Sequence, residues 1–228
     1  VVGIAKGAGM IEPNMATMLA FITTDAIVNS NTLSENLKIA VNQSFNRITI
    51  DGDMSTNDTV LMLANGASGI NIINESKIVQ QRFSEAINAI CACLAKKCVT
   101  DGEKVTKFVK VKVKRAPNTD SALKVARSIS NSLLVKSSWY GSDPNWGRII
   151  DAAGYAKVGI KFDQLSLNYN DCPALEKGKT MVQNKARWKE IVSSKEFSII
   201  LDLNMGSSEG EIWTNDLSEE YVNFNKSE

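Results

Sequence analysis

Histidine is absent from the 228 residues of this chain. Its absence excludes Ser–His and Cys–His nucleophilic pairs, and every histidine-ligated metal site, within this sequence. A nucleophile here must therefore take its base from a lysine, a carboxylate or an α-amine. Cysteine is scarce, and Cys91, Cys93, Cys98 and Cys172 match no metal or redox spacing. We expect them to be small buried apolar residues in a reducing compartment.

The chain also lacks a surplus of charge and any long apolar run. It has 26 basic and 25 acidic residues, which gives no reason to expect a nucleic-acid or membrane partner. No apolar stretch approaches the ~20 residues of a membrane span, and no signal-peptide pattern is present. The chain begins with Val1 instead of Met, and we expect it to be part of a longer protein.

The most informative stretch runs from Gly7 to Phe21. A glycine-rich segment broken by Pro13 leads into an apolar, β-branched run that predicts a buried strand. Thr17 lies where the two meet. If the bond before Thr17 breaks, its new α-amine, with a reference pKa of about 7.7–8.0, can take the proton of its own hydroxyl. By position alone, a threonine at the start of a strand is more often structural.

A polar loop from Asp51 to Thr59 carries three aspartates, at positions 51, 53 and 58. Carboxylates at alternate positions suit Ca²⁺, but no glutamate closes the loop as in an EF-hand. We therefore expect turn and capping hydrogen bonds from these side chains, and no metal site.

Periodicity and capping signals give a coarse α/β pattern of secondary structure. Residues 107–114 alternate valine with lysine, which predicts a strand with one solvated face. Asp143, Pro144 and Asn145 indicate a helix start. The sequence predicts strands over 17–26, 47–51, 107–114, 158–169 and 197–203, and helices from about 31 and over 76–99, 118–136, 149–155 and 187–193.

Three segments are similar to one enzyme family. KGAGMIEPNMATMLAFITTDA resembles the cleavage segment of the ornithine acetyltransferases, also called glutamate N-acetyltransferases, of arginine biosynthesis. DGDMSTNDTV resembles the family segment DGDTSTNDTV, which lies beside the active site. LVKSSWYGSDPNWGRI resembles LVKTA-x-x-G-x-DPNWGRI, and we expect most of its polar residues to build the fold. The similarity runs from Lys6 to Asn225.

This resemblance implies a catalytic site. Members of the family cut themselves at an Ala–Thr bond, here Ala16–Thr17, and the new N-terminal Thr17 carries the acetyl group as the nucleophile. The resemblance also implies substrate contacts for Lys6, Glu103 and Asn225. No metal and no cofactor is implied, although some relatives accept acetyl-CoA as acetyl donor.

The match departs from the family in two respects. This chain has DGEKVTKF where relatives have DGEGATKF, so Lys104 replaces a glycine. The similarity covers the family's second (β) chain and the tail of its first (α) chain. In relatives the α chain supplies the Thr-Gly pair of the oxyanion hole, so we expect these 228 residues alone to be inactive.

The implied fold is an α/β, layered α-β-β-α-type sandwich. The implied reaction moves an acetyl group from N2-acetylornithine to glutamate, giving ornithine and N-acetylglutamate, through an acetyl-Thr17 intermediate. Residues 1–16 would be the tail of the α chain. Residues 17–228 would be the β chain, a single domain or one with a smaller lobe from about residue 155. The implied partner is the missing α chain, in an αβ heterodimer that assembles into a heterotetramer. The implied location is the cytoplasm, or mitochondria or chloroplasts in eukaryotes.

Two alternatives stay open at this stage. One is a self-processing aminopeptidase of the same architecture, although such enzymes usually carry a serine nucleophile. The other is a non-catalytic fragment or subunit, which the missing first half favours.

Overall fold

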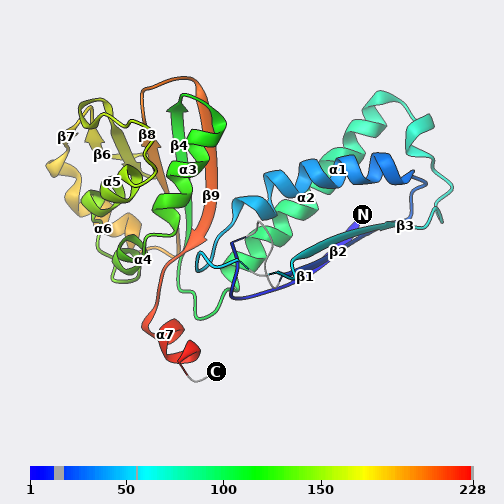
Figure 1. Cartoon of the computed structure of the whole chain (residues 1–228), viewed down its shortest axis with the longest axis horizontal. Coiled ribbons are helices and arrows are strands. Elements are labelled where there is room, and N and C mark those ends of the chain that lie inside the picture. The colour runs from blue at the N-terminus through cyan, green and yellow to red at the C-terminus, as the bar shows by residue number, and fades with distance from the viewer. Residues whose placement is uncertain (13–17, 55, 227–228) are drawn as a thin grey trace. The chain divides into compact units, whose positions relative to one another are not determined.

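The structure is a computed structural model that describes residues 1–12, 18–54 and 56–226. Its contacts divide the chain into two compact units, Val1–Asp101 and Gly102–Glu228. Both combine a sheet with helices, which confirms the α/β class (Figure 1). Residue 155, where a smaller lobe was expected to begin, lies inside the second unit. The expected division between residues 16 and 17 lies outside the described residues.

The first unit is a three-stranded sheet with order β1-β2-β3 and two α-helices. The pair β1–β2 is antiparallel, whereas β2–β3 is parallel and is joined by the crossover helix α1. The elements are β1 (Val2–Lys6), β2 (Leu19–Thr24), α1 (Ser30–Gln43), η1 (Phe45–Arg47), β3 (Thr59–Ala64), η2 (Ile72–Asn74) and α2 (Lys77–Thr100).

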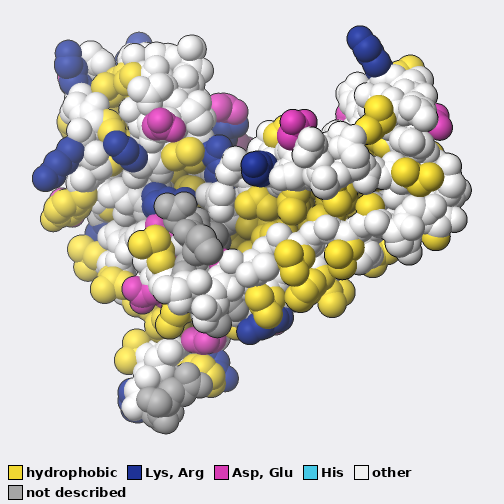
Figure 2. All heavy atoms as spheres, turned by 45° about the vertical axis from the view of Figure 1, so that its right-hand side comes forward, with side chains coloured by type: hydrophobic (Ala, Val, Ile, Leu, Met, Phe, Trp, Pro, Cys, Tyr) yellow, Lys and Arg dark blue, Asp and Glu magenta, His cyan; other side chains and the backbone are white. Residues whose placement is uncertain are grey.

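The two faces of this sheet differ in burial. Ala20 and Ile22 of β2 are fully buried, and Gly3 of β1 lies so close to α2 that a Cβ there would meet Ile90 and Leu94 at 2.9 Å. The opposite face, called the outer face below, exposes large apolar side chains: Val2, Ile4, Phe21, Leu61 and Leu63. Hydrophobic atoms are prominent on the surface of this unit (Figure 2).

The second unit is a six-stranded mixed sheet with order β7-β6-β5-β8-β4-β9. Of these neighbours, β4 and β8 are parallel and the other pairs are antiparallel. The elements are β4 (Phe108–Ala116), α3 (Thr119–Ser130), α4 (Leu133–Tyr140), α5 (Trp146–Gly154), η3 (Phe162–Gln164), β5 (Ser166–Tyr169), β6 (Cys172–Glu176), β7 (Lys179–Thr180), η4 (Val182–Asn184), α6 (Lys185–Val192), β8 (Glu196–Asp202), β9 (Ser208–Asn215) and α7 (Glu219–Asn225).

The alternation of β4 builds the core of the second unit. Val109, Val111 and Val113 are fully buried in one cluster with side chains of α3, α4, α5 and α6. Lys110 and Lys112 face the other way and pair with Glu196 and Glu209 on neighbouring strands. The predicted strand with one solvated face is confirmed.

Several predicted elements need correction. Residues 47–51 form no strand. Arg47 ends the short helix η1, and Ile48 and Ile50 are buried in the irregular segment that follows it. The helix predicted over 118–136 is two helices, since the Ser132 side chain caps a new one by accepting from Val135 N. The Asp-Pro-Asn pattern indicates Pro144 as the first helical residue, but the helix begins two residues later at Trp146, with Asn145 as its cap. Of the strand predicted over 158–169, only Ser166–Tyr169 forms a strand, which is β5. The sequence did not predict β1, β6, β7, β9 or α7.

Candidate functional site

One end of the first sheet gathers the start of β2 and the predicted substrate residue Lys6. Lys6 is the last residue of β1 and pairs with Leu19, the first residue of β2. Leu19 in turn pairs with Thr59, the first residue of β3. The register therefore places exposed Lys6 at the sheet end where the chain enters β2. Ala16 and Thr17 lie outside the described residues, so their roles stay predictions.

The aspartate loop between residues 51 and 58 holds the chain on both sides of the predicted cleavage bond. Asp51 accepts the backbone N–H groups of Met10 at 2.6 Å and Ile11 at 3.0 Å. Asp58 accepts the N–H of Met18 at 2.5 Å. A turn bond of the predicted kind is also present, since the N–H of Asp53 donates to Oδ1 of Asp51 at 3.3 Å. The amides of Met10, Ile11 and Met18, in contrast, lie 40 or 41 residues away along the chain, so spacing could not identify them.

Backbone hydrogen bonds reinforce both attachments. The N–H of Ile50 donates to the carbonyl of Ile11 at 2.7 Å, and the N–H of Thr59 donates to the carbonyl of Met18 at 3.0 Å. Each end of the segment from residue 11 to residue 18 is therefore tied to the same loop in two ways.

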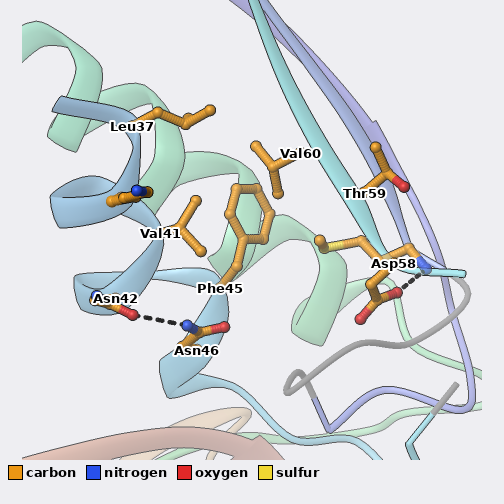
Figure 3. A pocket seen from close by; sticks show the side chains of 10 residues that line it. Leu37, Val41, Asn42, Phe45, Asn46, Asp58, Thr59 and Val60 are labelled. Carbon is orange, nitrogen blue, oxygen red and sulfur yellow. Dashed lines mark hydrogen bonds between the residues drawn. The ribbon is translucent and has the colours of Figure 1, made fainter. Parts of the chain in front are cut away.

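Asp58 lies beside a cavity of about 390 Å³ (Figure 3). Val41 from α1, Phe45 from η1 and Val60 from β3 form its apolar side, and Met18 also lines it. Burial raises the pKa of the Asp58 carboxyl, while the Met18 N–H and the charge of Lys6 act in the opposite direction. The second carboxylate oxygen of Asp58, Oδ2, is buried and has no hydrogen-bond partner among the described residues.

The other two predicted substrate residues meet in the second unit. Asn225, in α7, donates from Nδ2 to Oε2 of Glu103 at 3.0 Å, and also to the carbonyl of Tyr221 at 3.1 Å. Ser218, the cap of α7, donates to the carbonyl of Lys104 at 2.8 Å. The helix is thereby fixed to the turn that carries Glu103. The resulting carboxylate–amide pair is exposed and suits recognition of an ammonium group or an amino-acid backbone.

The backbone next to Glu103 has a conformation that suits glycine. Lys104 has a φ of 54°, in the left-handed region that glycine adopts most easily. Its Nζ lies 5.3 Å from the centre of the Phe224 ring in α7. The departure from the family pattern therefore keeps the turn and adds a contact to α7.

The polar side chains of the segment 134–149 mainly support the fold, as expected. Lys136 is buried, and its Nζ donates to the carbonyl of Asn215 and to its Oδ1, both at 2.6 Å, and to Oγ1 of Thr214 at 3.0 Å. Asn145 caps α5 by accepting from Arg148 N. These contacts join α4 to β9 and begin α5.

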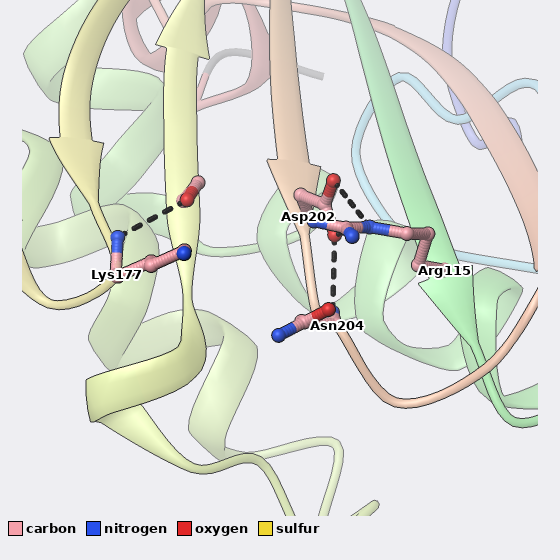
Figure 4. A network of polar contacts seen from close by, with 5 residues as sticks. Arg115, Lys177, Asp202 and Asn204 are labelled. Carbon is pink, nitrogen blue, oxygen red and sulfur yellow. Dashed lines mark hydrogen bonds and ion pairs between the residues drawn. The ribbon is translucent and has the colours of Figure 1, made fainter.

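A second cavity, of about 570 Å³, lies at the ends of β4, β5 and β8. It combines Lys114, Lys177 and Lys179 with Glu176 and Asp202. Arg115 Nε donates to both oxygens of Asp202, at 2.7 and 2.8 Å, and Asn204 N donates to the same carboxylate (Figure 4). This arrangement ties the end of β4 to β8 and leaves cations and carboxylates mixed.

Across the described ranges, no helix is long and apolar enough to cross a membrane. Within the same ranges, no three His, Cys, Asp or Glu side chains lie together in a way that could hold a metal ion.

The fold and the ties around residues 10–18 define an α/β protein whose loop carboxylates hold a segment leading into a core strand. The model of the ArgJ family matches residues 1–227. The chain belongs to the ArgJ family.

The relatives carry names from one pathway. The chain is 45% identical over 223 residues to an "Arginine biosynthesis bifunctional protein ArgJ" of Staphylococcus epidermidis, covering 98% of this chain and 56% of that protein. It is 45% identical over 229 residues to the protein of that name from Thermotoga neapolitana, covering 99% and 58%. The chain thus spans just over half the length of these curated relatives.

A solved structure has the same fold. It is the crystal structure of arginine biosynthesis bifunctional protein ArgJ from Bacillus halodurans, with a TM-score of 0.87 and 34% sequence identity. The match covers 93% of this chain and 100% of the solved chain. The solved chain is therefore no longer than this one, unlike the curated relatives.

Proposed function

We propose that this chain is the part of a glutamate N-acetyltransferase that carries the nucleophile. The protein would hydrolyse its own peptide bond between Ala16 and Thr17, with one water supplying the new carboxylate oxygen of Ala16 and the protons of the new Thr17 amine. It would then move an acetyl group from N2-acetylornithine to glutamate. The main support is the end of the first sheet, where Lys6 lies at the start of β2 and the carboxylates of Asp51 and Asp58 bind the nearby backbone. Membership of a family whose relatives are named for arginine biosynthesis supports it.

The chemistry proceeds in two balanced steps. The free α-amine of Thr17 takes the hydroxyl proton, Oγ attacks the acetyl carbonyl, and the ornithine amine leaves with a proton. The amine of glutamate then attacks the acetyl ester, and Thr17 regains its hydroxyl. This sequence needs no histidine, in keeping with a chain that has none.

Substrate binding falls to Lys6, Glu103 and Asn225 in this proposal. The hydrogen bond between Asn225 and Glu103 supports a joint role for these two, because it orients the carboxylate. A fixed carboxylate favours the side-chain ammonium of ornithine over a neutral side chain. Exposed Lys6 can attract a substrate carboxylate.

The proposed partner is the preceding α chain, in an αβ heterodimer that assembles further into a heterotetramer. Support comes from the outer face of the first sheet, where Ile4 is 67% and Leu63 59% exposed. A contiguous apolar face of this kind usually marks a contact with another protein segment. The α chain would also supply the oxyanion hole. Acetyl-CoA is a second candidate donor, and the cytoplasm is the proposed location.

The test is the intact mass of the full-length protein and of its Thr17→Ala variant. We expect the wild type to yield two chains, the second beginning at Thr17, and the variant to stay whole. Thr17→Ser is the matched control, since it keeps a hydroxyl and should still cleave. Folded wild-type protein that stays whole would contradict the proposal. Peptide hydrolysis without acetyl transfer would point to an aminopeptidase instead.

A further inference from the structure

The aspartate loop, residues 51–58, holds backbone amides on both sides of the Ala16–Thr17 bond. Met10 and Ile11 on one side, and Met18 on the other, donate their amides to Asp51 and Asp58. Both carboxylates come from one short loop that runs into β3. A chain fixed at both ends has far fewer conformations than a free loop, because each residue fixed removes backbone entropy. Such restriction favours a reaction that needs one geometry.

The two aspartates are placed differently with respect to the bond that would break. Asp51 holds amides five or six residues before it. Asp58 holds the amide of Met18, whose nitrogen is covalently bonded to the carbonyl carbon of Thr17. Asp58 is therefore the described carboxylate attached nearest to the proposed nucleophile.

The Asp58 carboxyl group lies in a costly position. Its Oδ2 is buried and lacks a hydrogen-bond partner among the described residues, while Oδ1 makes the short contact to Met18 N. A polar atom buried in this way destabilises the folded chain unless something else compensates. Stability alone therefore does not account for a carboxylate at this position.

We propose that Asp51 and Asp58 are positioning residues for self-cleavage: they hold the amides of Met10, Ile11 and Met18, which lie on either side of the Ala16–Thr17 bond in the sequence. The proposal rests on the proposed function, since it concerns the same Ala16–Thr17 bond. It goes beyond that function by assigning work to the aspartate loop.

The contact to Met18 depends on the ionised carboxylate. An ionised acceptor makes the stronger hydrogen bond, so protonation of Asp58 loosens its hold on Met18. The charged groups around it are Lys6 on β1 and Lys38, which lines the cavity from α1, with Asp51 and Asp53 in its own loop. Burial raises the pKa of Asp58, which moves the loosening above the usual acid range of an aspartate. Before cleavage Thr17 has no free amine, so an acid limb in the cleavage rate reports a carboxyl group.

The experiment compares four variants of the full-length protein: Asp58→Ala, Asp58→Asn, Asp51→Ala and Asp53→Ala. Asp53 is the control, because it is an exposed aspartate of the same loop whose carboxylate holds none of the three amides. Self-cleavage is followed by intact mass across a pH series. Backbone hydrogen exchange of the peptides covering residues 9–19 is measured in the Thr17→Ala background, where the chain stays whole.

We expect Asp58→Ala to slow cleavage about ten- to hundredfold, the factor expected for loss of a hydrogen bond to a charged group. Asp58→Asn keeps an acceptor oxygen, so it should slow cleavage less, and its rate should lose the acid limb seen in wild type. Asp51→Ala should also slow cleavage. Asp58→Ala should speed the exchange of the Met18 amide, and Asp53→Ala should leave both readouts at wild-type values.

Three outcomes would overturn the proposal. Unchanged exchange at Met18 in Asp58→Ala would show that Asp58 does not hold this amide. Faster exchange with an unchanged cleavage rate would show that this hold does not position the reaction. An acid limb that persists in Asp58→Asn would show that another group controls it. If wild type never cleaves, the proposed function fails with the positioning role, and the exchange data still decide whether Asp58 holds Met18.

Discussion

At the scale of single residues, Lys107 shows how a buried charge organises the second unit. It lies just before β4 and is 7% exposed. Its Nζ donates to the carbonyls of Trp139 and Val192, at 2.6 and 2.7 Å, and to Oγ of Ser142 at 2.6 Å. One ammonium group thereby joins the ends of α4 and α6 to the start of β4.

Replacing Lys107 by methionine should destabilise the protein by about 2–3 kcal/mol. The change keeps the length of the side chain but leaves buried carbonyls without a donor, and leaving a buried acceptor unsatisfied costs about 1–3 kcal/mol. The measurement is chemical denaturation at pH 7. Lys112→Met is the control, because Lys112 forms an exposed pair with Glu209, which is worth about 0–1 kcal/mol. Equal losses in the two variants would contradict this role of Lys107.

The same lysine gives a pH dependence with a defined sign. Burial lowers the pKa of Lys107 from 10.5, and the charge of Asp216 only partly opposes this. Between the lowered pKa and 10.5 the folded protein binds fewer protons than the unfolded chain, so the contribution of this group to stability rises with pH there. Below the lowered pKa the burial cost is fully present. Stability measured from pH 7 to pH 10.5 should show this rising contribution, which Lys107→Met removes.

The cysteines should react unequally. Cys91 and Cys98 are buried, and burial raises the pKa of each thiol to about 11, whereas Cys93 is exposed. Since the thiolate is the reactive form, alkylation at pH 8 should modify Cys93 well before the other two. Peptide mapping after timed alkylation measures this. Modification of Cys91 first in folded protein would contradict the packing of α2.

At the scale of elements, the turn between β8 and β9 fits against the end of β4. Gly206 lies there, and a Cβ at this position would be 2.4 Å from the carbonyl oxygen of Ala116. Met205 N donates to the carbonyl of Arg115 at 2.8 Å, so the turn cannot easily move away. The backbone contact therefore requires glycine.

Gly206→Ala should destabilise the protein by about 1–3 kcal/mol, the usual cost of forcing extra atoms into a packed site. Gly154→Ala is the control: Gly154 ends α5, and a Cβ there meets nothing within 4 Å. Alanine at that position should be neutral or stabilise by up to about 1 kcal/mol. Thermal unfolding of the two variants tests this, and a Gly206→Ala protein as stable as wild type would refute the close approach.

The sequence predicted elements whose signals are local. The alternation of β4 and the apolar periodicity of the helix over 76–99 are readable from neighbouring residues, and both elements are confirmed. The break after α3 was missed because the apolar pattern continues through Leu133, which the structure exposes at 64%. The ties from Asp58 and Asp51 were missed for a different reason. Their partners lie 40 or 41 residues away, and only the folded sheet brings them together.

The candidate site was predictable in part. The resemblance indicated Glu103 and Asn225 separately, and the structure joins them by a hydrogen bond that their separation of 122 residues could not reveal. The sequence predicted no strand around Lys6, whereas the structure makes Lys6 the exposed last residue of β1. Strand β1 escaped prediction because it is short and its glycine and alanine weaken the alternation.

At the scale of the whole molecule, the outer face of the first sheet predicts a mutational effect on assembly. Leu61→Asp places a charge on β3 in that face and should weaken the association of the two chains of cleaved full-length protein. Ile78→Asp is the control, since Ile78 is exposed to 66% in the first turn of α2, away from the strands. Size-exclusion chromatography of both variants gives the measurement. Normal co-elution of the two chains of the Leu61→Asp variant would show that this face is not where they bind each other.

The pairing of β1 with β2 has a consequence once the bond before Thr17 is cut. The five residue pairs from Val2–Thr23 to Lys6–Leu19 would then join two separate polypeptides. The preceding chain would donate its last strand to the sheet of the following one, much as in strand complementation. The two products would be halves of one interrupted hairpin, and dissociation would leave β2 with an unpaired edge. The cut would thus create a new chain terminus without dividing the sheet that holds it.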